Sequence, residues 1–155
     1  LTSAQIKNGL LQTKLFGRFQ VLPGTPQIVF DTAHNPQAIE SLRQNMLKLH
    51  FARRNFAVFG IAEDKDWAQI ITSCSQDFDA WYIAPINSER SAKIEQLVQE
   101  LIRNGVNSKN IIINSDIESA TELCYQQLNS EDRMVCFGSF LVVESAYKAI
   151  EKVRK

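Results

Sequence analysis

Five short apolar runs recur along this chain, and each is flanked by residues that break regular structure. They consist mainly of β-branched and aromatic residues and are continuous, without intervening polar positions. This pattern is typical of strands that are buried on both faces of a parallel sheet. The runs span residues 28–30, 56–59, 81–84, 111–113 and 134–137. One more strand is expected around residues 19–22, before a turn at Pro23-Gly24-Thr25-Pro26.

Amphipathic stretches lie between these runs. The clearest covers residues 91–104, where apolar side chains recur every three or four positions and Gly105 follows at the place of a helix-ending glycine. Its apolar stripe consists of Ile94, Leu97, Val98, Leu101 and Ile102. A second helix is expected after Asn35-Pro36, where a capping residue precedes a first-turn proline. Its stripe consists of Ile39, Leu42, Met46 and Leu49.

Other helices have recognisable starts. Asp66 stands at the cap position of a helix that begins at Trp67. Ser115-Asp116-Ile117-Glu118 reads as a capping box, ahead of a helix that carries Ala120, Leu123 and Cys124. Ser139 is expected to cap the last helix, and an amphipathic segment with Ile6, Leu10 and Leu11 opens the chain. The apolar face of the last helix consists of Val142, Ala146, Ala149, Ile150 and Val153.

Strands and helices therefore alternate through the chain. Repeated strand–helix–strand units predict an α/β fold, namely a three-layer, Rossmann-like sheet that is mostly parallel and carries helices on both faces. The 155 residues contain no linker, internal repeat or low-complexity tract. We therefore expect one domain over residues 1–155.

Composition and charge exclude several classes of protein. Hydrophobic residues make up 45%, and 17 basic residues balance 17 acidic ones, which is ordinary globular usage. No apolar run approaches the roughly 18–20 residues of a membrane span. No basic cluster indicates nucleic-acid binding, and we expect no signal peptide. The three cysteines are scattered without a C-x-x-C pair, which favours reduced thiols in the cytoplasm over a disulfide framework or a zinc site.

Ligands of open α/β sheets bind beyond the carboxyl ends of the strands. The polar residues that follow the expected strands there include Asp31, His34, Lys65, Arg90 and Ser139. Each also has an ordinary structural interpretation. Asp31 can be a turn acid, His34 an exposed loop residue and Ser139 a helix cap. Ser139 equally suits a carboxylate or phosphate held at a helix N-terminus.

No complete catalytic motif accompanies these residues. The six glycines are spaced so that neither a G-x-x-x-x-G-K-[ST] phosphate loop nor a G-x-G-x-x-G fingerprint occurs. There is no G-x-S-x-G elbow or Cys/His pairing either. Arg18 has the interpretation of a surface cation, and His50, at a helix end beside Phe51, that of a structural residue. We therefore expect no complete phosphoryl-transfer site in this chain.

Four motifs nevertheless occur in an order that is typical of one family. They are Phe16-Gly17-Arg18-Phe19-Gln20, Phe30-Asp31-Thr32-Ala33-His34-Asn35-Pro36, the stretch 60–66 with Asp64-Lys65-Asp66, and Phe137-Gly138-Ser139-Phe140. Together they resemble the C-terminal domain of bacterial bifunctional dihydrofolate synthases/folylpolyglutamate synthases, which belong to the Mur ligase superfamily. The resemblance covers almost the whole chain. It implies a junction helix over residues 1–15 and an N-terminal P-loop ATPase domain outside this chain, in agreement with the missing initiator Met.

The resemblance implies an ATP-dependent carboxylate–amine ligase. Such an enzyme adds L-glutamate to dihydropteroate or folyl-glutamates through an acyl phosphate, with ATP and Mg²⁺ as cofactors. The metal ligands are expected mainly on the N-terminal domain and none in this chain. The implied partners are that domain, ATP, L-glutamate and the folate or pteroate substrate. We expect a cytoplasmic monomer whose C-terminal part is inactive alone.

Five positions match functional residues of the family. Arg18 and Asp31 match nucleotide-binding residues, the arginine at the phosphates and the acid at the ribose. His34 matches a catalytic histidine between the nucleotide and the incoming glutamate, to which it also binds. Lys65 and Ser139 match positions that face the glutamate.

Two departures from the family and two alternative functions stay open at this point. Phe16 stands where proline is usual, and Leu141 where an aromatic residue or histidine is frequent. The nearest alternative function is a Mur-type ligase that acts on a cell-wall precursor. The other is a non-enzymatic doubly wound signalling or binding module. The sequence argues against it, because Asp31 has no adjacent acid to complete a magnesium-bound phospho-acceptor site.

Overall fold

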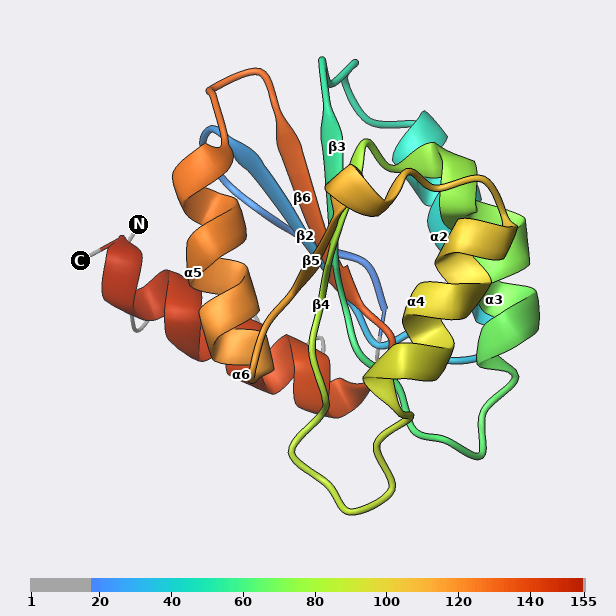
Figure 1. Ribbon diagram of the computed structural model, residues 1–155. Coiled ribbons are helices and arrows are strands. Elements are labelled where there is room, and N and C mark those ends of the chain that lie inside the picture. Colours follow the sequence, from blue (N-terminus) through green and yellow to red (C-terminus); the bar gives the residue numbers. More distant parts are fainter. Residues whose placement is uncertain (1–17, 155) are drawn as a thin grey trace.

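One six-stranded sheet runs through the computed structural model, which describes residues 18–154 (Figure 1). The strands are β1 (Gln20–Leu22), β2 (Gln27–Asp31), β3 (Asn55–Phe59), β4 (Ala80–Ile83), β5 (Ile111–Ile113) and β6 (Arg133–Phe137). The helices are α2 (Pro36–Leu47), α3 (Trp67–Cys74), α4 (Ile94–Arg103), α5 (Ile117–Gln127) and α6 (Phe140–Val153), with short 3₁₀ turns η1 (Ser75–Asp77) and η2 (Ser108–Asn110). The opening helix expected over residues 1–15, and Phe16 and Gly17, lie outside the described residues.

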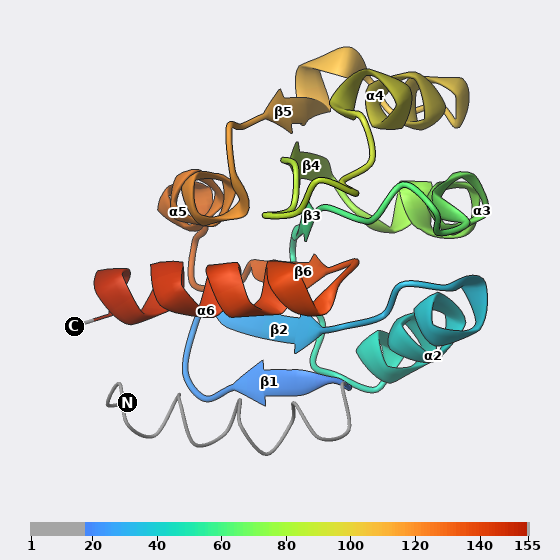
Figure 2. The same cartoon turned by 90° about the horizontal axis from the view of Figure 1, so that it is seen from below.

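The strands follow the order β1-β2-β6-β3-β4-β5, and every pair is parallel except β1 with β2. The chain steps from β2 through β3 and β4 to β5 in one direction, so right-handed crossovers place α2, α3 and α4 on one face. It then returns to insert β6 between β2 and β3, which places α5 on the other face beside α6. Figure 2 shows both helix layers on either side of the sheet. This confirms the expected three-layer, mostly parallel α/β architecture.

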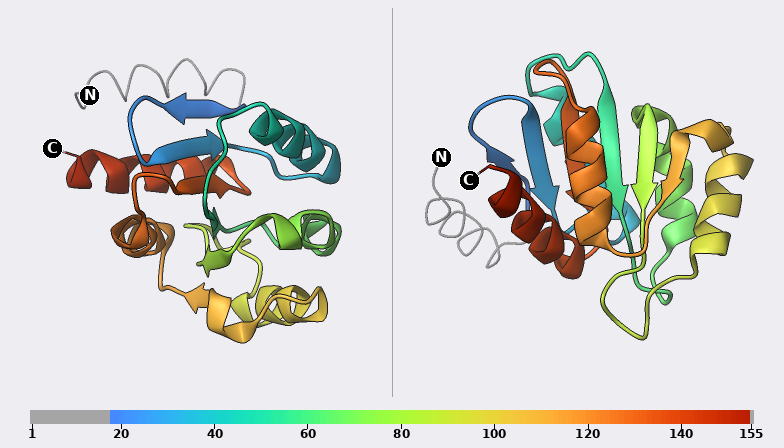
Figure 3. Two further views of the ribbon diagram at one scale, coloured as in Figure 1. Left: turned by 90° about the horizontal axis from the view of Figure 1, so that it is seen from above. Right: turned by 60° about the vertical axis from the view of Figure 1, so that its left-hand side comes forward.

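Two apolar cores fill the spaces between the sheet and its helix layers. Alternate residues of β6 serve both, since Val135 and Phe137 point toward α2–α4 while Met134 and Cys136 point toward α5 and α6. The right panel of Figure 3 shows α5 and α6 in front of the sheet. In the opposite core, the Phe59 ring lies 5.0 Å from that of Phe137 and 5.5 Å from that of Trp81, measured between centroids. All three cysteines are free and buried in these cores.

Some apolar positions are more exposed than the sequence pattern predicts. Run 111–113 was expected to be buried on both faces, but β5 is the edge strand and Ile113 is 59% exposed. Ile102, Leu123 and Val153 were assigned to buried helix faces and are exposed as well. Helices that cover the sheet from one side bury only a narrow stripe, so residues at its border face solvent.

Helix caps agree with the sequence at α2 and α6 and differ at α3 and α5. The Asn35 carboxamide oxygen accepts the Ala38 amide at 2.8 Å and caps α2 as expected. The cap of α5 is Asp116, which accepts the Ser119 amide at 2.7 Å, and not Ser115 at the head of the expected box. Asp66 occupies the cap position of α3, but its side chain makes no capping bond.

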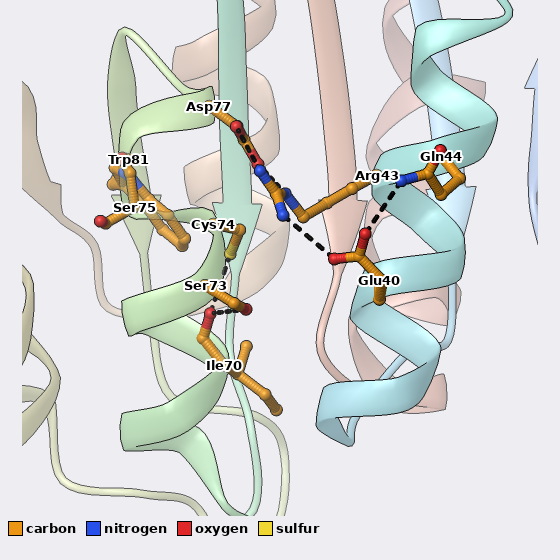
Figure 4. Close-up of polar contacts among 9 residues, drawn as sticks. All are labelled: Glu40, Arg43, Gln44, Ile70, Ser73, Cys74, Ser75, Asp77 and Trp81. Carbon is orange, nitrogen blue, oxygen red and sulfur yellow. Dashed lines mark hydrogen bonds and ion pairs between the residues drawn. The ribbon is translucent and has the colours of Figure 1, made fainter.

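Polar side chains tie neighbouring elements together on the face of α2–α4. Arg43 on α2 donates to Asp77 in η1 at 2.6 Å and to Glu40 one turn away at 3.0 Å (Figure 4). At the amino ends of the strands, buried Arg133 donates to Asn55 Oδ1 at 2.9 Å and also to the Gln27 side chain. These bonds fix the starts of β2, β3 and β6 relative to one another. Within residues 18–154, no helix is long and apolar enough to cross a membrane.

Candidate functional site

The carboxyl ends of β2, β6, β3 and β4 meet at one edge of the sheet, which faces the viewer in Figure 2. Because β1 runs antiparallel to β2, with Gln20 opposite Phe30, the residue before β1 reaches this same edge. The structure therefore places Arg18 next to Asp31, although twelve residues separate them in the sequence. We call this region the carboxyl edge.

Asp31 is the last residue of β2 and is only 2% exposed. Its Oδ1 accepts the Ala33 amide at 2.9 Å, and the amide of Phe19 lies close enough to favour the charged carboxylate. Burial raises the pKa of Asp31 from 3.8 to about 6, because the charged form loses its hydration. The two amides and the charge of Arg18 act in the opposite direction and lower that pKa. Asp31 is thus both the expected turn acid and a buried polar group at a strand end.

His34 lies in the short connection between β2 and α2 and is half-buried. Its Nδ1 lies 2.9 Å from the carbonyl oxygen of Thr32. A carbonyl can only accept, so Nδ1 carries the hydrogen and Nε2 is left as the acceptor of the neutral ring. The next residue, Asn35, caps α2. Strand end and helix start therefore hold the histidine between them, in one tautomer.

Ser139 follows β6 and caps α6. Its hydroxyl oxygen accepts the Leu141 amide at 3.0 Å, and its carbonyl accepts the amide of Val142 at 3.1 Å. The expected cap is confirmed, yet the hydroxyl keeps its own hydrogen for donation to a ligand. The positive end of the α6 dipole adds a preference for an anion there.

Two glycines allow the strand ends to approach closely. Gly138, between β6 and Ser139, has φ +116°, and a Cβ on it would lie 2.1 Å from the carbonyl oxygen of Gly60. A Cβ on Gly60 would lie 2.7 Å from the carbonyl oxygen of Ala84. Neither position can accept a side chain without backbone movement. The chain segments that leave β6, β3 and β4 are therefore in direct backbone contact.

Lys65 lies in the exposed loop between β3 and α3. Its loop is joined to the one after β4, because the Glu63 amide donates to the Arg90 carbonyl at 2.6 Å and the Ala92 amide to the Ile61 carbonyl at 2.8 Å. An isolated bridge in the same place pairs residues 62 and 91. The Lys65 side chain itself is exposed and forms no ion pair with any residue in 18–154. Lys65 therefore shares the carboxyl edge with the other candidates without an ion pair to any of them in the described part of the chain.

Sequence reasoning missed two features of this edge. Phe19 has a φ of +40°, in the left-handed region that favours glycine, and an aromatic residue gives no sequence signal for it. The close approach at Gly60 and Gly138 had a weaker signal, since each glycine directly follows an apolar run. His50, the other histidine, lies near the opposite edge and is exposed there.

One hollow in the described part of the chain lies away from the carboxyl edge. It has a volume of about 470 Å³ and lies at the amino ends of β2 and β6, between residues such as Gln27, Phe51 and Asp132. The left panel of Figure 3 views this side of the molecule. Among residues 18–154, no group of three or more His, Cys, Asp or Glu side chains is arranged to hold a metal ion. None of the candidate residues of the carboxyl edge lines this hollow.

Comparison with known proteins identifies the family to which this domain is similar. Residues 17–140 match the family model described as the Mur ligase, glutamate ligase domain. The dihydrofolate synthase/folylpolyglutamate synthase of Escherichia coli (strain K12) is 33% identical over 149 residues, which are 96% of this chain and 34% of that protein. The chain spans about a third of the length of the curated relatives it matches.

Solved structures agree with this match. E. coli FolC in complex with ADP, without folate substrate, has a TM-score of 0.78 at 33% identity and covers 89% of this chain and 32% of that one. A bifunctional folylpolyglutamate synthase/dihydrofolate synthase with Mn, AMPPNP and L-glutamate bound has a TM-score of 0.74 at 29% identity, over 90% of this chain and 32% of that one. The α/β fold expected from the sequence is the fold of these proteins.

Proposed function

The chain belongs to the Mur ligase family through its glutamate ligase domain, and we propose that it is the C-terminal part of an ATP-dependent ligase of folate metabolism. The parent enzyme would join the amino group of L-glutamate to a carboxyl group of dihydropteroate or a folyl-glutamate. ATP would be converted to ADP and phosphate, so that an activated carboxyl group is attacked by the amine and an amide forms. The match over residues 17–140 carries the proposal, because it contains every candidate residue from Arg18 to Ser139.

Arg18 is the residue that suits the nucleotide phosphates. Its guanidinium is exposed at the carboxyl edge, and an arginine fork can donate two parallel hydrogen bonds to phosphate oxygens. A cation in this place stabilises negative charge that develops during phosphoryl transfer. Asp31 belongs to the same nucleotide-facing side, at the end of β2. In this proposal most ligands of Mg²⁺ come from the N-terminal domain of the parent chain, and the ion neutralises phosphate charge there.

His34 suits the transfer of a proton from the incoming amine. The amino group of glutamate enters as an ammonium group and must lose protons before the amide is complete. Because Nδ1 donates to Thr32, the lone pair of Nε2 can accept a proton from that group. His34 is therefore proposed as the catalytic residue of this chain.

Lys65 and Ser139 suit the carboxylates of L-glutamate. The exposed Lys65 ammonium supplies a positive charge, and Ser139 supplies a hydroxyl donor at the start of α6. A glutamate with its carboxylates held there would present its amine to the activated carboxyl group. A cytoplasmic location agrees with the three free thiols and with the use of ATP. The parent is taken to act as a monomer in which the N-terminal domain faces the carboxyl edge.

The proposal is tested by replacing each histidine of the chain in the parent enzyme. We expect His34→Ala to lower kcat for glutamate addition by roughly 10²- to 10⁴-fold, the usual contribution of a positioned acid–base group. His50→Ala is the matched control and should keep wild-type kinetics, since that residue is exposed near the opposite edge. Both variants should melt at the wild-type temperature. Equal activity of the two variants would show that His34 has no part in catalysis.

The choice of substrate separates the proposal from its nearest alternative. The parent enzyme should form amide with dihydropteroate or a tetrahydrofolyl-glutamate as acceptor, with release of ADP. A nucleotide-linked peptide precursor of the cell wall should give no product. Turnover with only the cell-wall precursor would overturn the folate assignment while leaving the family assignment intact.

A further inference from the structure

Arg90 is a cation of the carboxyl edge to which the proposed function gives no partner. It lies in the loop between β4 and α4, which extends beyond the sheet at this edge in Figure 1. Its side chain is exposed, and within residues 18–154 its guanidinium takes part in no ion pair. An arginine that no acid of its own chain neutralises is available to a carboxylate or phosphate of a ligand.

The two ends of this loop are anchored in opposite cores. Ile86 is buried in the core beside α5 and α6, whereas Ala92 is buried in the core of α2–α4. The Ser91 hydroxyl joins the two ends, because it accepts the Ile86 amide at 3.0 Å and donates to the Ala92 carbonyl at 3.3 Å. The exposed part of the loop therefore stands on a fixed base.

Both backbone polar groups of Arg90 are hydrogen-bonded as well. Its amide donates to the Ser88 hydroxyl oxygen at 3.1 Å, and its carbonyl accepts the Glu63 amide at 2.6 Å. The second bond lies next to the bridge between the two loops and attaches Arg90 to the loop that carries Lys65. An exposed arginine with a fixed backbone loses less conformational freedom on binding than one on a mobile segment.

Acidic residues of the same two loops restrict what Arg90 can hold. Glu63, Asp64 and Glu89 are exposed there. Their charges repel a free anion that approaches from solvent, although salt screens this repulsion. A carboxylate on a substrate that is already bound elsewhere in the parent enzyme still reaches Arg90, because its effective concentration is high. The arginine fork then offers two parallel donors to its two oxygens.

The proposed reaction contains one carboxylate that has no assigned partner. L-Glutamate brings two carboxylates, which Lys65 and Ser139 suit. A folyl-glutamate acceptor brings a third, because its terminal glutamyl residue has two carboxyl groups, of which one is activated and the other stays free. Dihydropteroate has a single carboxyl group, the one that is activated. The two acceptors therefore differ by a glutamyl residue that carries one free negative charge.

We infer that Arg90 binds the free carboxylate of the terminal glutamyl residue of a folyl-glutamate acceptor. The inference rests on the proposed function, which supplies both acceptors. Arg90 is then a specificity-determining residue, since dihydropteroate has no group for it to bind. Because the Arg90 side chain is exposed, water solvates it when dihydropteroate is bound, and that acceptor is not penalised.

The first experiment compares Arg90→Ala with wild type in the parent enzyme. For a folyl-glutamate acceptor, kcat/KM should fall roughly ten- to hundredfold, as expected for the loss of a charge-assisted bidentate contact. For dihydropteroate it should stay within about twofold of wild type, and KM for L-glutamate should be unchanged with either acceptor. Arg90→Lys keeps the charge without the fork and should show a smaller loss.

A third acceptor tests the contact itself. It is the monoamide of the folyl-glutamate that keeps the reacting carboxyl group and has a carboxamide in place of the free carboxylate. Arg90→Ala should use this analogue as well as wild type does, because the charge that Arg90 binds is already absent.

The matched control is Lys93→Ala, which removes another exposed cation from the same side of the molecule, at the N-cap position of α4. It should keep wild-type kinetics with every acceptor. Both variants should melt at the wild-type temperature, since neither side chain is ion-paired in the described part of the chain.

Each other outcome overturns the inference. A raised KM for L-glutamate with both acceptors would place Arg90 at the incoming amino acid. Equal losses in Arg90→Ala and Lys93→Ala, or the same loss with the monoamide, would reduce its role to general charge attraction. If Arg90→Ala shows wild-type kinetics throughout, or if the parent accepts dihydropteroate and no folyl-glutamate, the ligase assignment stands and this inference alone is wrong. A parent enzyme that adds glutamate to neither acceptor would overturn the proposed function, and the inference with it.

Discussion

Side chains at the carboxyl edge have structural roles that do not exclude the proposed chemical ones. The Ser139 hydroxyl caps α6 and still has a hydrogen to donate. The Asp31 carboxylate closes the turn after β2 while it lies beside the charge of Arg18. A turn acid or a helix cap is therefore no argument against function. A buried, ionised group with such a double role lowers the stability of the fold, and Asp31 is an example.

Asp31 makes the stability of the chain depend on pH. The folded chain holds the Asp31 proton more tightly than the unfolded chain, with a pKa of about 6 against 3.8. Raising the pH from about 4 to about 6 therefore lowers the free energy of unfolding, by on the order of 3 kcal/mol from this group. Asp31→Asn should lose this dependence, so the variant should gain stability relative to wild type as the pH rises.

Urea unfolding of both proteins at pH 4, 5, 6 and 7 measures the effect. The quantity to compare is the difference between wild type and variant at each pH, because all other titrating groups are common to the two. Two stability curves that run parallel across this range would contradict the raised pKa of Asp31. If Asp31→Asn is more stable than wild type at neutral pH, the ionised carboxylate of Asp31 lowers the stability of the wild-type chain.

At the scale of elements, the carboxyl edge depends on backbone contacts between strand ends. Gly138 touches the carbonyl of Gly60, and Gly60 touches that of Ala84. These contacts set the spacing of the loops that carry Ser139 and Lys65. At the other end of the strands, Arg133 donates to residues at the starts of β2 and β3. Hydrogen bonds from an arginine side chain join the strands at the amino edge, whereas close backbone contacts at two glycines join them at the carboxyl edge.

Gly138→Ala and Gly24→Ala separate backbone conformation from steric contact. Both glycines have positive φ, +116° and +94°, but a Cβ on Gly24 meets no atom within 4 Å whereas one on Gly138 meets the Gly60 carbonyl. We expect Gly24→Ala to cost about 1 kcal/mol of stability. Gly138→Ala should cost more than about 2 kcal/mol, because the ends of β6 and β3 must also separate.

Thermal and urea unfolding of the two variants provide the comparison. In the parent enzyme, Gly138→Ala should further raise KM for glutamate, since Ser139 moves with the strand end. Gly24 lies in the turn between β1 and β2 at the amino edge, and its variant should leave that KM unchanged. Equal destabilisation by the two substitutions would mean that the close contact at Gly138 adds nothing to the free-energy cost of its substitution.

For the whole molecule, each face of the sheet has its own apolar core while the polar residues gather on one open edge. Both cores are completed by residues of this chain, from the aromatic cluster around Trp81 to the contacts of α5 and α6 with the sheet. The carboxyl edge, by contrast, offers isolated cations, a histidine and a hydroxyl. Folding is therefore a property of this chain, whereas the proposed chemistry needs a surface opposite the edge.

The isolated 155-residue chain should consequently fold but perform no reaction. Its sequence has no G-x-x-x-x-G-K-[ST] loop to hold ATP phosphates. We expect cooperative unfolding by circular dichroism, together with no ATP hydrolysis and no glutamate addition above the buffer blank. The parent enzyme serves as the positive control under the same conditions. Turnover by the isolated chain would contradict the proposal that the site is shared with another domain.

The sequence by itself determined the elements, the fold class and the edge of the sheet at which the candidate residues lie. Apolar runs and helical stripes are local patterns, so the five mutually parallel strands and the helices after them could be predicted within a few residues. Strand ends follow from the same patterns: Asp31 ends β2, and the loops after the strands contain His34, Lys65 and Ser139. The matched motifs then identified the family, because they depend on residue type and order alone.

Only the tertiary structure decided which of these residues meet. The insertion of β6 between β2 and β3, and the antiparallel direction of β1, depend on contacts between segments far apart in the chain. These contacts bring Arg18 beside Asp31, bury its carboxylate and bend the backbone at Phe19. They also leave Ile113 exposed at the sheet edge. Local patterns record the periodicity of one segment, whereas strand order, burial and strain result from how all segments pack together.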